Sequence, residues 1–225
     1  MWLTLRRIFA ALLCALMLTI PVCADAGIRY VALTFDDGPS GRFTRRPLDG
    51  LRERDARATF LLCGYRIEDY PAEAKRIAAE GHEIGIHGYS HDAMSLMTEV
   101  QVTAEIQKTK THLPGNTVFL RPPGGKYNEA TISAAQKAGL AILSWSLDPR
   151  DWDTDDIAAI VSRVVGKVKD GDVILLHDMS DSSVTAALRI VDQLQPQGFR
   201  FVTVSQLAQI KGVEPNPGQV YTHFP

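Results

Sequence analysis

The sequence is poor in cysteine and carries no surplus of basic residues. Cysteine occurs only at Cys14, Cys23 and Cys63 among 225 residues. A chain that loses its first 24 residues keeps Cys63 alone and cannot form an internal disulfide. The formal net charge is −2, which argues against a nucleic-acid-binding protein, because such proteins carry a basic surface patch.

The sequence also lacks an apolar run of transmembrane length, although its N-terminus is apolar. Two arginines precede the 13-residue run IFAALLCALMLTI, and Val22 and Ala24 then occupy the small-residue positions of a cleavage site. A membrane-spanning helix needs about 20 apolar residues, so the pattern favours a secretory signal peptide over residues 1–24 rather than an uncleaved signal anchor. Cleavage after Ala24 or Ala26 would leave an exported protein in the periplasm, the cell envelope or the extracellular space, with no stable membrane insertion.

Beyond residue 27 the chain alternates short β-rich runs with helical patterns, as in folds built from βα units around a parallel sheet. The expected strands are Tyr30–Phe35, Ala58–Leu62, Glu83–His87, Val118–Arg121, Ala141–Trp145, Val173–His177 and Phe199–Val202. We therefore predict a single α/β domain over residues 28–212, with about seven βα repeats where a complete barrel has eight. The proline-rich residues 213–225 are expected to form a loosely ordered tail.

Polar side chains follow the predicted strands at their carboxyl ends, where α/β folds place their functional residues. They come from five of the strands and are Asp36, Asp37, His87, His91, Arg121, Asp148, Asp151 and His177. Because the carboxyl ends of parallel strands share one edge of the sheet, we expect these side chains to lie together in one site.

His87 and His91 are four residues apart, so a helical turn would place both imidazoles on one face. Two histidines and one carboxylate leave a coordination position open for water, and such a set suits Zn²⁺, with Co²⁺, Ni²⁺ and Mn²⁺ as alternatives. A solvated histidine pair is the non-functional interpretation. The adjacent Asp36 and Asp37 favour a metal site, since one carboxylate can bind the ion while the other serves as general base.

Five short motifs in order carry a family resemblance: TFDDGP, HGYSH, RPPGG, DPRDW and LLH. From about Tyr30 to Leu207 the sequence resembles the polysaccharide deacetylases of carbohydrate esterase family four, the group that contains the nodulation-type chitooligosaccharide deacetylases. The resemblance implies a distorted, incomplete (β/α)7-type barrel that holds one divalent metal ion and hydrolyses an N-acetyl group on a sugar.

The resemblance also implies the catalytic roles of four residues. Asp36 is similar to the family's general base, and Arg121 to the arginine that orients this base. His177 is similar to the general acid, and Asp151 to the carboxylate that tunes it. An amine leaves poorly as an anion, so a protonated histidine is needed at the leaving nitrogen, and an adjacent carboxylate favours the charged imidazolium.

Three further residues resemble the metal ligands, namely Asp37, His87 and His91. Leu175 and Trp152 resemble walls of the acetyl pocket, and the backbone N–H of Gly124 is the expected donor to the developing oxyanion. Two positions depart from the usual pattern of the family. Gly124 stands where an aromatic residue is frequent, and Gly88 stands where a serine or threonine hydroxyl commonly braces the histidine loop.

The expected substrate is an N-acetylated glycan, either peptidoglycan or a chitin-like polymer of N-acetylglucosamine or N-acetylmuramic acid units. The enzyme is expected to be a monomer. An O-acetyl xylan esterase with the same site is an alternative, because metal, base and pocket serve an ester equally well. Two other classes are a non-haem iron oxygenase, which also uses two histidines and one carboxylate, and a non-catalytic glycan-binding module, which needs neither Asp36 nor His177.

Several other polar or aromatic residues receive a structural interpretation. His82, His112 and His223 are expected at the surface, and Trp145 in the core. Asp178 and Asp181 precede a predicted helix, so capping is their expected role. The basic residues near the first loop form either a solvated face or a contact for an acidic glycan, and they are Arg42, Arg45 and Arg46.

Overall fold

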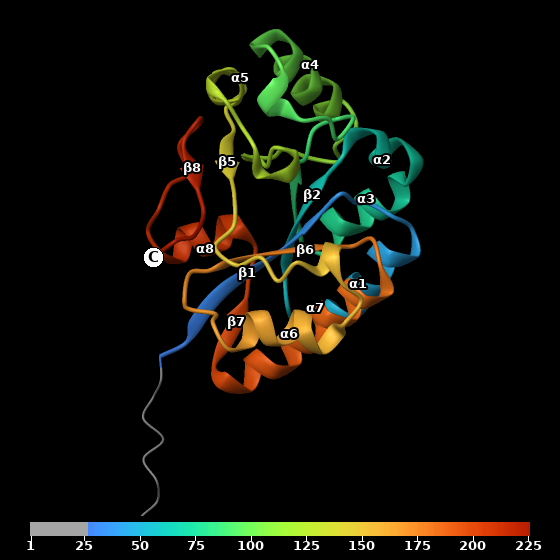
Figure 1. Ribbon diagram of the computed structural model, residues 1–225, viewed down its shortest axis with the longest axis vertical. Coiled ribbons are helices and arrows are strands. Elements are labelled where there is room, and N and C mark those ends of the chain that lie inside the picture. The colour runs from blue at the N-terminus through green and yellow to red at the C-terminus, as the bar shows by residue number, and fades with distance from the viewer. Residues whose placement is uncertain (1–26) are drawn as a thin grey trace, which may run out of the picture.

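The structure is a computed structural model that describes residues 27–225 (Figure 1). The predicted signal peptide, residues 1–24, lies outside the described residues. Within residues 27–225, no helix is both long and apolar enough to cross a membrane.

Strands and helices alternate along the described chain, as the sequence predicts. The strands are β1 (Arg29–Asp36), β2 (Ala58–Leu62), β3 (Glu83–Ile86), β4 (Phe119–Leu120), β5 (Ala141–Leu143), β6 (Val173–His177), β7 (Phe199–Phe201) and β8 (Val220–Tyr221). The α-helices are α1 (Arg42–Glu53), α2 (Gly64–Asp69), α3 (Pro71–Ala79), α4 (Glu99–Lys110), α5 (Glu129–Lys137), α6 (Ile157–Val165), α7 (Asp181–Leu194) and α8 (Val204–Ile210). Short 3-10 helices are η1 (Met94–Leu96), η2 (Pro123–Gly125), η3 (Asp151–Asp153) and η4 (Gln195–Gln197).

The strands form one parallel sheet in the order β6-β1-β2-β3-β4-β5-β8, with β7 paired to the start of β1. The sheet curls, because the chain after β5 turns toward β6. There Leu147 forms a parallel bridge with Ile174, and the N–H of Leu175 donates to the carbonyl of Leu147 at 2.9 Å. The barrel is thus nearly closed, which confirms the predicted distorted and incomplete α/β barrel.

Strand β1 lies between β2 and β6, and its last six residues are buried. Phe35 of β1 stacks on Phe60 of β2 with ring centroids 5.0 Å apart, so aromatic contacts fix the register of these two strands. Helices α1, α6 and α7 lie together at one end of the molecule, and α4 and α5 at the other (Figure 1). This packing anchors the strand whose carboxyl end carries Asp36.

The last residues of the chain differ from the predicted loose tail. Val220 and Tyr221 form β8 along β5. Tyr221 stacks on Phe224 at 5.4 Å, and Phe224 is fully buried. These two aromatic side chains cover the apolar edge next to β5, and burying them offsets part of the entropy lost when the segment is ordered. Proline content alone did not reveal this contact.

Candidate active site

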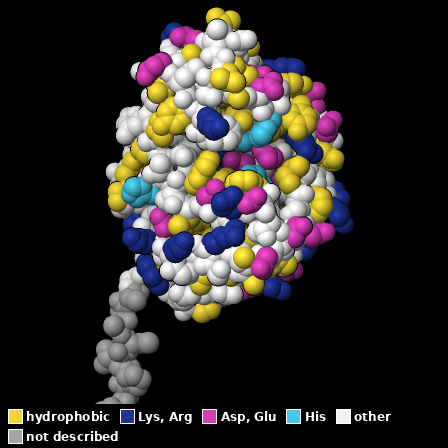
Figure 2. Space-filling model, viewed as in Figure 1, with side chains coloured by type: hydrophobic (Ala, Val, Ile, Leu, Met, Phe, Trp, Pro, Cys, Tyr) yellow, Lys and Arg dark blue, Asp and Glu magenta, His cyan; other side chains and the backbone are white. Residues whose placement is uncertain are grey.

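The predicted polar residues meet in one cavity at the carboxyl edge of the sheet. Acidic and histidine side chains gather near the middle of the face seen in Figure 2. The cavity has a volume of about 310 Å³ and is lined by Asp36, Asp37, His87, His91, Gly124, Trp145, Asp148, Trp152, Leu175 and His177. Arg121 and Asp151 do not line this cavity, but each is hydrogen-bonded to a residue that does.

Asp36 and Asp37 are neighbours in sequence, yet their carboxylates have different surroundings. Asp36 ends β1 and is buried, and its Oδ1 accepts a hydrogen bond of 2.6 Å from Nη1 of Arg121, which is also buried. Asp37 has a φ of 73°, in the left-handed region. This turn of the backbone directs the two adjacent carboxylates to separate partners.

Asp37 faces two histidines. Its Oδ1 lies 3.3 Å from Nε2 of His87 and 3.0 Å from Nε2 of His91, and this buried oxygen has no other hydrogen-bond partner among the described residues. Burial by itself would raise the pKa of Asp37, but the two imidazoles outweigh it and hold this pKa well below its usual range.

These three side chains fit a divalent metal ion. One ligand atom from each lies within 4.8 Å of the others, and the set combines two neutral nitrogen donors with one carboxylate oxygen. Three such ligands satisfy part of a tetrahedral shell and leave a position for water. Zn²⁺ suits this donor set, and Co²⁺, Ni²⁺ or Mn²⁺ can also occupy it.

The two histidines are held differently. His87 is buried, and its Nδ1 lies 2.7 Å from the carbonyl of Arg121, which fixes the tautomer that presents Nε2 to Asp37. The side chain of His91 is 43% exposed. The predicted helical turn between them is wrong. Gly88 and His91 have φ values of 81° and 65°, and the intervening residues form a bend, so a tight loop brings the imidazoles together.

His177 and Asp151 form the other pair in the site. His177 ends β6, and its Nδ1 lies 2.8 Å from Oδ1 of Asp151, whose second oxygen accepts from the backbone N–H of His177 at 2.8 Å. Burial alone would lower the pKa of His177, but the hydrogen bond and negative charge of Asp151 outweigh it and raise this pKa to about 9. The imidazole is therefore held as a proton donor with Nε2 toward the cavity.

The remaining predicted residues form the cavity wall. Gly124 has a φ of 63°, and a side chain added there would meet open space. Leu175 is buried on β6, whereas Trp152 is 58% exposed. The wall therefore combines an aliphatic side, a backbone segment and an accessible indole ring.

This fold and this site match a known family. The family model described as polysaccharide deacetylase matches residues 24–143, and a curated relative is 38% identical over 90% of its own length. The chain belongs to the polysaccharide deacetylase family.

Three similar members of the polysaccharide deacetylase family illustrate the match. That 38% identical relative is the peptidoglycan-N-acetylglucosamine deacetylase of Bacillus cereus, and the alignment covers 81% of this chain. The chitooligosaccharide deacetylase of Sinorhizobium fredii is 35% identical, over 78% of this chain and 90% of that protein. The family 4 acetyl xylan esterase of Clostridium thermocellum, solved with cobalt, has a TM-score of 0.81 at 31% identity, over 88% of this chain and 100% of that chain.

Two residues of this polysaccharide deacetylase belong to the site although the sequence analysis assigned them no role there. Trp145, expected in the core, lines the cavity. Its ring lies against Gly125, where a Cβ would approach it to 2.5 Å, so only glycine admits this contact. Trp145 is the last residue of the expected strand Ala141–Trp145, and the strand-end rule applied to aromatic residues would have found it.

Glu105 of α4 is the second such residue. Its Oε2 accepts hydrogen bonds from the backbone N–H of Tyr89 at 2.7 Å and of Ser90 at 2.9 Å, and from Oγ of Ser90 at 3.0 Å. This carboxylate braces the loop that carries His91, as a hydroxyl at position 88 is expected to do in other family members. No local pattern in the sequence marks Glu105, because the contact depends on how α4 packs.

Other polar residues have structural surroundings that partly differ from the predictions. His82 is buried rather than exposed, and its Nδ1 accepts from the N–H of Ala58 at 3.1 Å. Asp178 is buried and bonded to Thr44, so it does not cap α7, and burial raises its pKa to about 7. The capping residue is Ser180, whose Oγ accepts from the N–H of Ser183.

The three arginines near the first loop form ion pairs with acidic side chains, namely Arg42–Asp181, Arg46–Asp181 and Arg45–Glu73.

Proposed function

We propose that this chain is an exported, metal-dependent hydrolase that removes N-acetyl groups from a glycan. The observation that carries the proposal is the different environment of two adjacent carboxylates. Asp37 lies within 3.3 Å of both histidines, while Asp36 is hydrogen-bonded to Arg121 and lies 3.8 Å from the nearer histidine, His87. One acid is placed to hold a metal ion, and the other stays free to accept a proton.

In the proposed reaction Asp36 is the general base. Its carboxylate takes a proton from the attacking water, and Arg121 keeps it charged and oriented through the 2.6 Å hydrogen bond. The new C–O bond places negative charge on the former carbonyl oxygen. The backbone N–H of Gly124 is assigned as a donor to this oxygen, and one such donor is worth about 3 kcal/mol in the transition state.

His177 is the proposed general acid. When the C–N bond breaks, the imidazolium donates its proton to the departing nitrogen, so the products are acetate and the free amine of the sugar. Asp151 accepts one hydrogen bond from the ring Nδ1 of His177 and one from its backbone N–H, and its charge stabilises the imidazolium. Leu175 and Trp152 are assigned as the walls around the acetyl methyl group.

The proposed metal ligands are Asp37, His87 and His91, and Zn²⁺ is the ion that we assign. When bound, the ion would polarise the amide carbonyl and lower the pKa of a water molecule. Asp36 lies beside this position, with its Oδ2 3.8 Å from Nε2 of His87. A carboxylate at that distance from a proposed ligand is placed to accept a proton from a water molecule that the ion would activate.

Peptidoglycan and chitin-like polymers are the proposed substrates, because relatives covered at 90% of their length are named for deacetylating them. The similarity to an acetyl xylan esterase supports O-deacetylation as a second candidate. We further propose cleavage of the N-terminal segment and a monomeric mature enzyme in the periplasm, the cell envelope or the extracellular space.

Acetate release tests the proposed function. The chain lacking residues 1–24 is loaded with Zn²⁺ or Co²⁺ and given peptidoglycan, chitooligosaccharides and acetylated xylan in parallel, with Asp36→Asn as the blank. We expect release from an N-acetylated glycan and none from the blank. Release from xylan alone would assign the esterase function. If no acetate were released from any of the three substrates although metal is bound, the hydrolase proposal would be overturned.

A further inference from the structure

Asp178 is a buried acidic residue that has no role in the proposed reaction. It directly follows His177, and its exposed fraction is 0%. Its Oδ2 accepts a hydrogen bond from Oγ1 of Thr44 in the first turn of α1. Its Oδ1 is also buried and has no hydrogen-bond partner among the described residues. Burial of a polar oxygen without a partner costs free energy, so packing alone does not explain an acid at this position.

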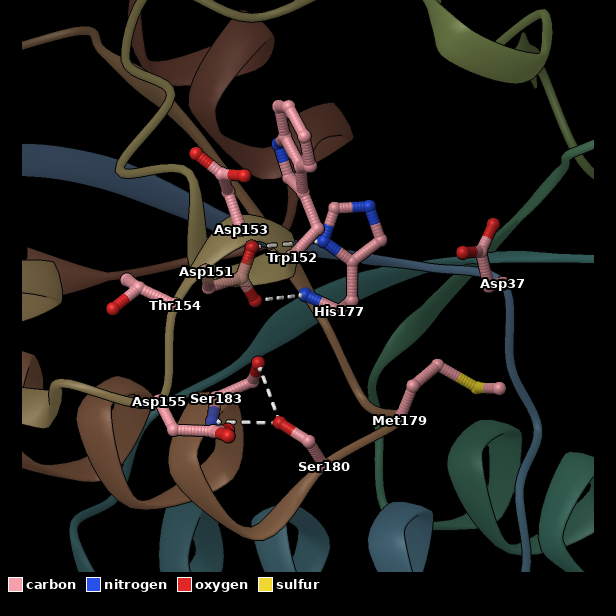
Figure 3. A pocket seen from close by; sticks show the side chains of 10 residues that line it. All are labelled: Asp37, Asp151, Trp152, Asp153, Thr154, Asp155, His177, Met179, Ser180 and Ser183. Carbon is pink, nitrogen blue, oxygen red and sulfur yellow. Dashed lines mark hydrogen bonds and ion pairs between the residues drawn. The ribbon is translucent and has the colours of Figure 1, made fainter.

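Asp178 lies where two strands of the site separate. In the register of β1 and β6, Asp36 is paired with His177, so Asp37 and Asp178 are the first residues beyond the paired ends. One chain segment then enters the turn 38–40 that leads to α1, and the other leads to α7. Figure 3 shows Asp37 and His177 lining a second cavity, of about 420 Å³, beside the active-site cavity that both also line. Since the strand pairing stops at Asp36 and His177, other contacts must set the spacing beyond it.

Asp178 connects the two segments through the turn after β1. Oγ of Ser40 donates to the carbonyl of Asp178. Oγ1 of Thr44 donates to the carboxylate of Asp178 and accepts from the backbone N–H of Ser40 at 2.7 Å. On the other side of the turn, the carbonyl of Gly38 accepts from the N–H of Cys63 at 3.0 Å. All five residues are buried, so the turn is held between the end of β2 and the residue after β6.

Gly38 shows how closely the carboxylate approaches this turn. A Cβ added at Gly38 would overlap both carboxylate oxygens of Asp178. The φ of Gly38 is not in the left-handed region, so the backbone conformation does not require glycine there, whereas the carboxylate does. Asp37 directly precedes Gly38, and a shift of the turn would therefore move the carboxylate that faces His87 and His91.

We propose that Asp178 is a positioning residue that fixes Asp37, the proposed metal ligand, relative to His177, the proposed acid, and this inference rests on the proposed function. Asp178 lines neither of the two cavities beside His177, so it acts through the turn at Gly38. Burial, the main cause, raises the pKa of Asp178 to about 7. A neutral amide of the same shape can therefore replace the carboxyl group with little change of charge.

The first test compares metal binding in variants of Asp178. Competition with a chelator measures Zn²⁺ affinity, and the visible spectrum of the Co²⁺ protein reports the arrangement of the ligands. Asp178→Ala removes the carboxyl group, whereas Asp178→Asn keeps an oxygen for Thr44. Ile190→Ala, in the buried face of α7, is the control for lost stability. Asp181→Asn, exposed at the start of α7, is the control for a lost acid.

We expect Asp178→Ala to bind Zn²⁺ about 10-fold more weakly than wild type and to change the Co²⁺ spectrum. Asp178→Asn should stay within about threefold of wild type, and both controls should match wild type. Wild-type affinity and spectrum in Asp178→Ala would overturn the proposal. The same losses in Ile190→Ala would also overturn it, because a general loss of stability would then explain them.

Gly38→Ala tests the contact from the other side. The new methyl group would meet the carboxylate of Asp178, so the turn must shift, and Zn²⁺ affinity should fall by about 10-fold. The double variant Gly38→Ala/Asp178→Ala has room for the methyl group, so its loss should be smaller than the product of the two single losses. Gly115→Ala, where a Cβ meets open space, should match wild type. If the two single losses simply multiplied, the carboxyl group and the turn would act independently, contrary to the proposal.

Turnover at saturating Zn²⁺ separates positioning from substrate binding. Asp178→Ala should lower kcat for acetate release by about 10-fold and leave KM nearly unchanged, because Asp178 lines neither cavity. An unchanged kcat would contradict the proposal. If Asp178→Ala does not fold, Thr44→Val removes the same hydrogen bond with a side chain of equal size and replaces it in each comparison. Failure of the proposed function differs from these outcomes, since the wild-type protein would then bind no Zn²⁺ or release no acetate.

Discussion

Arg121 and Asp36 form a buried ion pair across the sheet, with Nη1 2.6 Å from Oδ1. The same guanidinium also donates to Oγ1 of Thr34 at 2.8 Å and to the carbonyls of Leu143 at 3.2 Å and Ser144 at 2.8 Å. Arg121 therefore links β1 to the end of β5 and to the residue after it while it holds the proposed base. One residue thus serves both the fold and the site.

Removal of this guanidinium is expected to destabilise the protein strongly. Arg121→Met leaves the Asp36 carboxylate buried without a counter-charge, and the loss of one partner of such a pair costs about 3–5 kcal/mol. The double variant Asp36→Asn/Arg121→Met should recover part of this loss, because no charge then remains buried. Urea denaturation of the two variants measures the difference. If the double variant were no more stable than Arg121→Met, the unpaired charge would not be the cause.

Loss of an imidazole is expected to weaken metal binding more than loss of the base. His87→Ala removes one of three proposed ligands, so competition with a chelator should show Zn²⁺ affinity reduced by more than about 100-fold. Asp36→Asn should bind Zn²⁺ within about threefold of wild type while losing turnover. Tight Zn²⁺ binding by His87→Ala would place the metal elsewhere.

Glu105 is expected to control metal affinity without contacting the metal. Glu105→Ala frees the N–H groups of Tyr89 and Ser90, so the loop that presents His91 loses its brace and Zn²⁺ affinity should fall by about 10–100-fold. Glu105→Gln keeps an acceptor oxygen, so its Zn²⁺ affinity should lie between those of Glu105→Ala and wild type. The matched control is Glu99→Gln at the exposed start of the same helix. The visible absorption spectrum of the Co²⁺ protein should change in Glu105→Ala only, and an unchanged spectrum and affinity would remove Glu105 from this role.

The alkaline limb of the pH–rate profile is expected to depend on Asp151. Asp151 raises the pKa of His177 to about 9, so this proposed acid stays protonated up to that pH and loses its proton above it. Asp151→Asn removes the negative charge, so this limb of kcat/KM should move to lower pH. A bound cation would shift both profiles downward together, and the informative quantity is the difference between them. Asp153→Asn, two residues further along the chain but paired with Arg150, should leave the alkaline limb at the wild-type pH.

His82 is expected to make the fold sensitive to acid. Burial, which is the main cause, and the charge of Arg57 lower its pKa from 6.5 to about 4. Its contribution to stability is therefore present above pH 6.5 and is lost as pH falls through the window toward 4. His82→Asn retains an acceptor for the N–H of Ala58 but does not titrate. The stability advantage of wild type over His82→Asn should shrink by about 2 kcal/mol between pH 7 and pH 4.5. A constant advantage would show that the pKa of His82 is the same in the folded and the unfolded protein.

Local sequence patterns are enough to predict where the strands lie in the chain and that the site lies at the carboxyl edge of the sheet. Five of the β-rich runs end in or are followed by polar residues such as Asp36 or His177, and parallel strands bring those ends to one edge of the sheet. The same rule located Arg121 and Asp151, which do not line the active-site cavity but are hydrogen-bonded to Asp36 and His177, which do. The predictions for these strands and for the incomplete barrel are confirmed because they depend on patterns within a few residues of one another.

Tertiary structure decided the features that depend on distant contacts. A positive φ at His91, rather than a helical turn, brings its ring to His87. Glu105 reaches the histidine loop only because α4 packs beside β3, and the tail is ordered only because Phe224 finds a buried position. Asp178 reaches the first turn of α1 only because α1 packs against α7. Sequence alone determined which chemical groups are present and at which strand ends, whereas the packing of segments far apart in the chain decided what each group contacts.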